Sequence, residues 1–126
     1  MNKKDIAILY VDDEPANLFL FKARFSREYP VYTAESAQVG LKELEDHKDK
    51  IIVVISDMRM PQMNGVEFIR KARQTFDKLV YFILTGFEYD QEIEEALNKK
   101  LISRFFTKPF DKREIDEAIA FEVSNN

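Results

Sequence analysis

Cysteine and tryptophan are absent from the sequence, and its 126 residues include only three glycines and four prolines. Because there is no cysteine, a disulfide-bonded scaffold is excluded. Because no stretch is rich in glycine, serine or proline, we find no linker between domains. The sequence therefore predicts one domain over residues 1–126, which is long enough to bury a single hydrophobic core.

Long apolar stretches are also missing. Uninterrupted ones such as 51–55 and 79–84 have only five and six residues, whereas a membrane-spanning helix needs about 20. The N-terminal residues lack the long apolar core and the small-residue cleavage site of a signal peptide. We therefore expect a cytoplasmic protein that makes no contact with a membrane.

An excess of positive charge is missing as well. The chain has 19 basic and 23 acidic residues, which give a formal net charge of −4. Its basic residues are scattered in pairs such as Lys3-Lys4 and Lys99-Lys100. Because nucleic-acid binding usually needs a concentrated basic surface, we expect no direct contact with DNA or RNA.

What the sequence does contain is an alternation of two hydrophobic periods. Short apolar runs at 6–11, 51–55 and 79–84 lack the in/out alternation of a half-exposed strand, and they predict strands covered on both faces. Two weaker strands are predicted at 31–34 and 104–106. Apolar spacings of three and four residues predict helices at 16–28, 36–46, 65–76, 90–101 and 111–123, with Ser36 and Asp111 as N-caps.

Five strands that alternate with five helices predict parallel pairing through right-handed crossovers. The predicted fold class is α/β: a doubly wound five-stranded parallel sheet of flavodoxin-like order 2-1-3-4-5, with helices on both faces. In such sheets ligands bind at the carboxyl ends of the strands, beside the point where the strand order reverses.

The apolar run 18–21 in the first predicted helix has two interpretations. Its side chains are either more deeply buried than those of a simple amphipathic helix, or they form a patch that binds a partner.

Polar side chains follow four of the five predicted strands. The first strand ends in Asp12 and Asp13, the third in Asp57 and the fourth in Thr85, and Lys108 follows the fifth. If the fold is right, these groups meet at one edge of the sheet. Carboxylates ~4 Å apart repel by roughly 4 kcal/mol per pair at an effective dielectric of about 20. A divalent cation would relieve this repulsion, and oxygen ligands suit Mg²⁺.

The other groups at this edge suit an anion. Lys108 supplies a positive charge, Thr85 a hydroxyl donor, and Gly86 a backbone N–H that no Cβ obstructs. Together they predict a pocket for a phosphoryl group, with Asp57 as the nucleophile. An ionised carboxylate has no proton to lose, so this transfer needs no separate general base.

At these positions the chain resembles the receiver domain of bacterial two-component response regulators. The matching stretches are Ile8-Leu-Tyr-Val-Asp-Asp-Glu-Pro15, Ser56-Asp-Met-Arg-Met-Pro-Gln-Met-Asn-Gly65, Leu84-Thr-Gly86 and Phe105-Phe-Thr-Lys-Pro-Phe110. The resemblance covers essentially the whole chain. It implies that Asp57 accepts a phosphoryl group from a phosphohistidine on a sensor histidine kinase or a phosphotransfer protein. It also implies that the chain is no enzyme beyond this transfer and its own dephosphorylation.

The resemblance further implies a set of ligands for Mg²⁺. These are Asp13, Asp57 and the backbone carbonyl of Arg59, with Asp12 helping to hold the ion through water. In this family the rate at which the acyl phosphate hydrolyses depends on two side chains, one two positions after the acceptor and one two positions after the threonine. In this chain they are Arg59 and Phe87. Two bulky side chains there predict a shielded, long-lived phosphoryl group.

A switch is the last implication of the resemblance. Thr85 and Lys108 would contact the phosphoryl oxygens, with the Lys108-Pro109 peptide in the cis form. Phe105 stands at the aromatic switch position of the family. Movement of Thr85 toward the phosphoryl group would free space for the Phe105 ring, for which we expect an inward rotamer because it has no hydroxyl to keep at the surface. The face made by the fourth helix, fifth strand and fifth helix would then repack and bind an effector, or a second copy in a homodimer.

A rival function comes from a different class: a Mg²⁺-dependent phosphohydrolase that uses an aspartate nucleophile on a small metabolite. Such an enzyme usually carries its nucleophile after the first strand, in an Asp-x-Asp pattern, and has a cap over its substrate. The sequence shows neither feature. A degenerate receiver that only binds partners is disfavoured too, because the acidic, hydroxyl and lysine positions are all filled.

Overall fold

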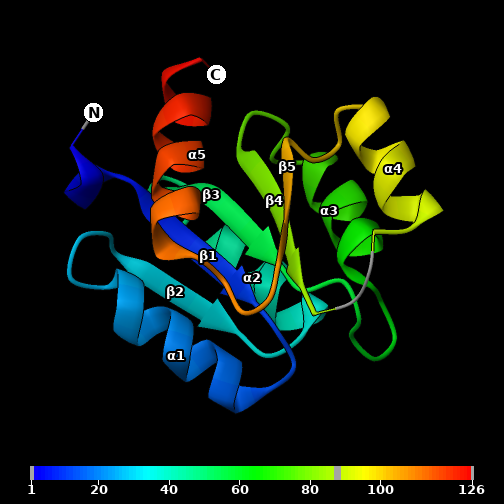
Figure 1. The fold of residues 1–126 in the computed structure, drawn as a ribbon, viewed down its shortest axis with the longest axis horizontal. Coiled ribbons are helices and arrows are strands. Elements are labelled where there is room, and N and C mark those ends of the chain that lie inside the picture. Colours follow the sequence, from blue (N-terminus) through cyan, green and yellow to red (C-terminus); the bar gives the residue numbers. More distant parts are fainter. Residues whose placement is uncertain (1, 87–88, 126) are drawn as a thin grey trace.

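Five parallel strands form one sheet in the order β2-β1-β3-β4-β5 (Figure 1). The structure is a computed structural model and describes residues 2–86 and 89–125. The strands are β1 (Ala7–Val11), β2 (Val31–Ala34), β3 (Ile51–Ser56), β4 (Val80–Thr85) and β5 (Arg104–Thr107). The helices are a 3-10 turn, η1 (Lys3–Asp5), and α1 (Pro15–Phe25), α2 (Ala37–Asp46), α3 (Gly65–Arg73), α4 (Gln91–Asn98) and α5 (Lys112–Ser124). The predicted fold class and strand order are confirmed.

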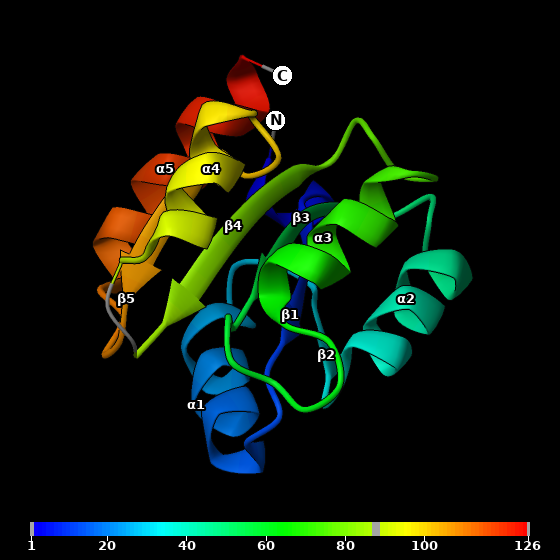
Figure 2. The ribbon, with the colours of Figure 1, turned by 90° about the vertical axis from the view of Figure 1, so that its right-hand side faces the viewer.

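Helices α1 and α5 cover one face of the sheet, and α2, α3 and α4 cover the other (Figures 1 and 2). Successive strand residues point to opposite faces, so a strand in the middle of this sheet buries all its side chains. Along β1, Leu9 and Val11 pack with α2 and α3, whereas Ile8 and Tyr10 pack with α1 and α5. Every residue of β1 is buried, as its unbroken apolar run predicts.

The two strands with weak apolar signals, β2 and β5, lie at the edges of the sheet. Most of their residues are half-buried or exposed, and only Ala34 and Phe106 are buried. An edge strand has a neighbour on one side only, so fewer of its side chains are covered. This position explains why their apolar runs are short.

Three helices end earlier than predicted, α1 at Phe25, α3 at Arg73 and α4 at Asn98. After α4 the chain turns at Lys100, whose φ of 60° lies in the left-handed region. Leu101, directly beyond this turn, packs against the core. Apolar residues that follow a helix thus prolong its periodic pattern without belonging to it. Within the described residues, none of the helices has the length and apolar character needed to span a membrane.

The helix starts follow local hydrogen bonds. Ser36 accepts from the backbone N–H of Val39, and Asp111 accepts from two N–H groups in the first turn of α5, so both predicted caps are confirmed. Asn64 and Glu67 form a reciprocal capping box at α3, which the sequence analysis missed. This box fixes where α3 begins, directly after the loop that leaves β3.

The apolar run in α1 is divided between the core and the surface. Phe21 is fully buried, whereas Phe19 is 72% and Leu20 is 54% exposed. The prediction of deeper burial is therefore confirmed for Phe21. A partner-binding patch remains a prediction for Phe19 and Leu20.

Candidate functional site

Three carboxylates gather where β1 and β3 end, at the reversal of the strand order. Parallel pairing aligns Val11 with Ser56, so Asp12 and Asp57 leave neighbouring strands side by side. One carboxylate oxygen from each of Asp12, Asp13 and Asp57 lies within 4.8 Å of the others. The structure thus brings together the three acids that the sequence analysis selected.

Asp57 is held from several sides. Its backbone N–H donates to the carbonyl of Val11 at 2.8 Å, and its carbonyl accepts from the Ser56 hydroxyl at 2.8 Å. Its side-chain Oδ1 accepts from the Met58 N–H at 2.8 Å. These bonds leave Oδ2 as the oxygen that faces Lys108.

Lys108 reaches the cluster from the segment that follows β5. Its Nζ donates to Oδ2 of Asp12 at 2.7 Å and to Oδ2 of Asp57 at 3.3 Å. Its backbone N–H donates to the carbonyl of Thr85 at 2.9 Å, which ties it to the end of β4. The Lys108-Pro109 peptide is cis, as the family resemblance implies.

Asp12 is fully buried and has hydrogen-bond donors on both oxygens. Oδ1 accepts from the Glu14 N–H at 2.9 Å, and Oδ2 accepts from both Lys108 and the phenol hydroxyl of Tyr10, the latter at 2.7 Å. Tyr10 was not predicted as a site residue, because a tyrosine within an apolar run is typical of a core strand. Its spacing of two from Asp12, which puts both side chains on one face of an extended chain, was the available signal.

Burial and charge perturb the ionisable groups of the site. Burial raises the pKa of Asp57, and the charge of Asp12 raises it further, while Lys108 and a hydrogen bond from Thr85 act in the opposite direction. Burial alone would lower the pKa of Lys108, but its hydrogen bond to Asp12 and the charge of Asp57 outweigh this effect and raise it. Lys108 therefore stays an ammonium group. Burial, followed by the charge of Asp12, raises the pKa of Tyr10 well above its usual value.

The remaining predicted residues lie around this cluster. Thr85 is fully buried at the end of β4, and Gly86 next to it faces open space. Phe105 is half-buried, and its ring centroid lies 5.7 Å from that of Tyr89. Phe87 lies outside the described residues.

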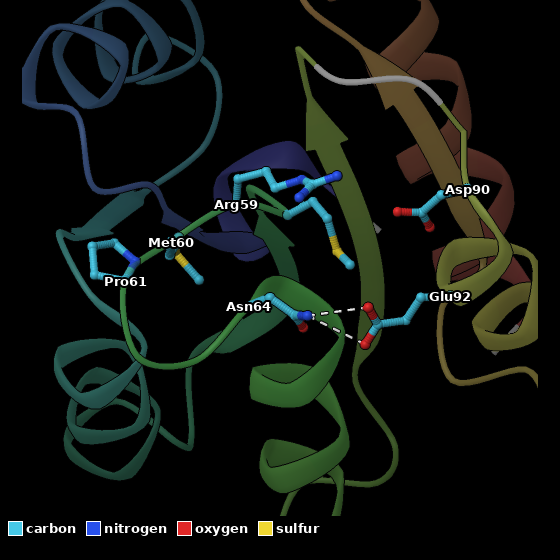
Figure 3. Close-up of a pocket in the computed structure, with 7 residues that line it drawn as sticks. Arg59, Met60, Pro61, Asn64, Asp90 and Glu92 are labelled. Atoms are coloured by element: carbon cyan, nitrogen blue, oxygen red, sulfur yellow. Dashed lines mark hydrogen bonds between the residues drawn. The ribbon is translucent and has the colours of Figure 1, made fainter.

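A pocket of about 430 Å³ opens beside the loop that follows β3 (Figure 3). Arg59, which is exposed, lines it together with residues from the start of α4. Across the pocket, Nδ2 of Asn64 donates to both carboxylate oxygens of Glu92 at 3.2 Å (Figure 3). This contact joins the start of α3 to α4.

The arrangement combines two chemical capacities. An all-oxygen set of three carboxylates suits a hard divalent cation. The ammonium group of Lys108, which is 20% exposed, supplies positive charge to an anion placed at Asp57.

A sequence model described as the response regulator receiver domain matches residues 8–120. Sporulation initiation phosphotransferase F of Bacillus subtilis is 30% identical over 120 residues, which cover 94% of this chain and 92% of that protein. The alkaline phosphatase synthesis transcriptional regulatory protein PhoP of Bacillus subtilis is 35% identical over 121 residues, which cover 94% of this chain and 48% of that protein. The chain thus spans from about a quarter to about a half of the length of several curated relatives that it matches.

Solved structures show the same similarity. A response regulator receiver domain protein from Clostridium thermocellum superposes with a TM-score of 0.84 at 27% sequence identity. The match covers 95% of each chain. The resemblance inferred from the motifs is therefore confirmed by sequence and by fold.

Proposed function

Because the chain belongs to the receiver-domain family of two-component response regulators, we propose that it accepts a phosphoryl group on Asp57. The donor is a phosphohistidine on a sensor histidine kinase or a phosphotransfer protein in the cytoplasm. One observation carries the proposal: the Asp57 carboxylate lies among two further acids and within 3.3 Å of the Lys108 ammonium. This combination suits a carboxylate that accepts a phosphoryl group.

The transfer needs little covalent chemistry from the protein. An oxygen of Asp57 attacks phosphorus, the phosphorus–nitrogen bond breaks, and its electron pair returns to the imidazole of the donor. Lys108 and Thr85 stabilise the charge that develops on the phosphoryl oxygens. The Met58 N–H, which donates to Oδ1, keeps the carboxylate oriented during the attack.

The acidic cluster fits Mg²⁺ by its donor chemistry, because it offers carboxylate oxygens and no nitrogen or sulfur. Asp13, Asp57 and the carbonyl of Arg59 would hold the ion, with Asp12 assisting through water. When bound, Mg²⁺ neutralises charge on the phosphoryl oxygens. The Arg59 side chain, two residues after the acceptor, would shield the acyl phosphate and prolong its lifetime.

The output is a change in the surface formed by α4, β5 and α5. The Thr85 hydroxyl, which already donates a hydrogen bond to Asp57, follows the phosphoryl group that is added there, and the half-buried Phe105 ring moves into the space that the hydroxyl leaves. The repacked surface binds a downstream effector protein or domain, or a second copy of the chain, without direct contact with nucleic acid or a membrane. An Asp57→Asn variant should lose every donor-dependent change in hydrogen exchange on this surface, whereas an unaltered response would refute the switch.

Intact-mass spectrometry tests the transfer itself. The protein is incubated with Mg²⁺ and a small acyl-phosphate or phosphoramidate donor. We expect the wild type to gain one phosphoryl group per chain and Asp57→Ala to gain none. Asp49→Ala removes an exposed acid ahead of β3 and serves as the matched control, which should still be labelled. Continuous consumption of donor without a covalent adduct would favour a phosphohydrolase instead.

A further inference from the structure

We infer that Tyr10 is a positioning residue that allows Lys108 to leave Asp12. Its phenol hydroxyl keeps the buried Asp12 carboxylate hydrogen-bonded while Lys108 turns toward a phosphoryl group on Asp57. The inference rests on the proposed function of Asp57, and it concerns a residue of the core that has no contact with the phosphoryl donor in that proposal.

Lys108 and Tyr10 share one acceptor atom. Both donate to Oδ2 of Asp12, each at 2.7 Å. Lys108 also donates to Asp57, but at 3.3 Å, so its shorter contact in this structure is with Asp12. A phosphoryl group on Asp57 would add negative charge beside the same ammonium group and draw it away from Asp12.

The departure of Lys108 has an energetic consequence for Asp12. This residue is fully buried, and a buried charged oxygen that loses its donor is strongly disfavoured. With Tyr10 in place, Oδ2 keeps one donor when Lys108 moves. Without the phenol hydroxyl, Lys108 would be the sole side-chain donor to this oxygen among the contacts described, and its movement would leave Oδ2 without one.

The position of the Tyr10 hydroxyl does not depend on Lys108. The ring is 1% exposed, and it stacks on Phe21 with centroids 4.3 Å apart. Phe21 stacks in turn on Phe25, also at 4.3 Å. A ring fixed by the core is suited to hold the carboxylate while the flexible lysine moves.

Removal of one oxygen atom tests this role. Tyr10→Phe keeps the ring and its stacking. The control, Tyr81→Phe, removes the hydroxyl of an equally buried tyrosine on β4, which donates to the carbonyl of Phe76. Each protein is titrated with beryllium fluoride, a tetrahedral phosphoryl analogue, in the presence of Mg²⁺, and the bound analogue is observed by ¹⁹F NMR. Binding of Mg²⁺ alone is measured by calorimetry, and thermal unfolding confirms that the variants are folded.

We expect Tyr10→Phe to weaken binding of the analogue about tenfold, the scale of one hydrogen bond to a charged group. Its affinity for Mg²⁺ alone should change by less than about twofold on the same scale, and Tyr81→Phe should bind both as the wild type does. Equal binding of the analogue by Tyr10→Phe and wild type would overturn the inference. An equal loss of affinity for Mg²⁺ alone would also overturn it, because Tyr10 would then act on Asp12 without Lys108. If the wild type binds no analogue, the proposed function itself fails.

Discussion

Gly65 occupies a position at which a larger side chain would collide with the backbone of the acceptor. A Cβ built there would lie 2.3 Å from the carbonyl oxygen of Asp57 and 2.9 Å from Cδ1 of Ile83. The backbone of Gly65 has no positive φ, so its conformation is open to other residues. Close approach is therefore the reason for glycine, and it lets the Gly65 N–H donate to the carbonyl of Met58 at 2.8 Å.

A Gly65→Ala substitution should lower the free energy of unfolding by about 1–3 kcal/mol, because the nearest obstacle is backbone and cannot turn aside. Gly86→Ala is the matched control, since a Cβ at Gly86 would meet nothing within 4 Å. It should change stability by less than about 0.5 kcal/mol. Urea denaturation measures both. Similar stabilities for the two variants would contradict the packing argument.

The acids of the site could be predicted from sequence, because each of them follows a strand whose apolar run is easily recognised. Lys108 follows the weaker run of β5, which was still long enough to place it at the end of a strand. Tyr10 could not be assigned in the same way. A tyrosine inside an apolar run is equally compatible with a core residue, and only the extended path from Tyr10 to Asp12 shows that its hydroxyl reaches the carboxylate.

Asn64 connects two helices through the two ends of its amide. Its Oδ1 accepts from the Glu67 N–H at 2.8 Å and caps α3, while Nδ2 donates to Glu92 in α4. The amide thus does more than a simple N-cap, which needs only an acceptor. It holds the start of α4 beside the loop that follows Asp57 (Figure 3).

Replacing the amide by a carboxylate separates these two roles. Asn64→Asp keeps an acceptor for the cap but loses the donor and places a negative charge opposite Glu92. We expect faster hydrogen exchange in residues 91–98 with α3 little affected. Asn64→Ala should lose the cap as well, and its free energy of unfolding should be about 1–2 kcal/mol lower than that of the wild type. Unchanged exchange in α4 of Asn64→Asp would show that the contact with Glu92 does not hold this helix.

The strands were predictable where their apolar runs were long and unbroken, as for β1 and β3. The ends of the helices were harder to predict from the sequence. Leu101 is apolar and packs against the core, yet it follows the turn at Lys100, so composition alone does not separate it from α4. The capping box at Asn64 was not predicted, because Asn64 lies within the stretch 56–65 that also matches a family motif.

At the scale of the whole molecule, an ionic network joins η1 and the start of α5 to the segment that follows α1. Glu28, which follows α1, pairs with Lys3 at 3.0 Å and with Lys112 at the start of α5. Lys112 also pairs with Asp116 at 2.7 Å, and Asp116 accepts from the Tyr29 hydroxyl at 2.8 Å. Hydrogen bonds from Lys112 and Lys3 lower the pKa of Glu28 from its ordinary value of 4.5 to about 2.

This network predicts the acid response of stability. Because folding lowers the pKa of Glu28, its contribution is complete above pH 4.5 and is lost as the pH falls from 4.5 through about 2. Glu28→Gln should therefore lose less stability than the wild type between neutral pH and pH 3. Glu117→Gln, which removes a more exposed carboxylate of α5, is the control and should respond as the wild type does. The free energy of unfolding is measured at both pH values, and an equal loss for wild type and Glu28→Gln would refute the prediction.

The parallel pairing and the edge where the site lies followed from the alternation of strands and helices, whereas the strand order 2-1-3-4-5 was a preferred topology that the structure confirms. The ionic network did not follow from this alternation, because its charges come from residues far apart in sequence, such as Lys3 and Lys112. Charged residues are common on any surface, and only the folded structure, in which the start of α5 meets the segment after α1, shows which of them form pairs.

Chemical mapping of the phosphorylated residue tests the central claim most directly. The protein is treated with donor and Mg²⁺, and borohydride then reduces the acyl phosphate to an alcohol, which converts the labelled aspartate to homoserine. Peptide mass spectrometry locates the modified position. We predict homoserine at position 57 alone, and none in Asp57→Asn. Homoserine at Asp12 or Asp13, or consumption of the donor with no modified residue, would contradict the assignment of Asp57 as the acceptor.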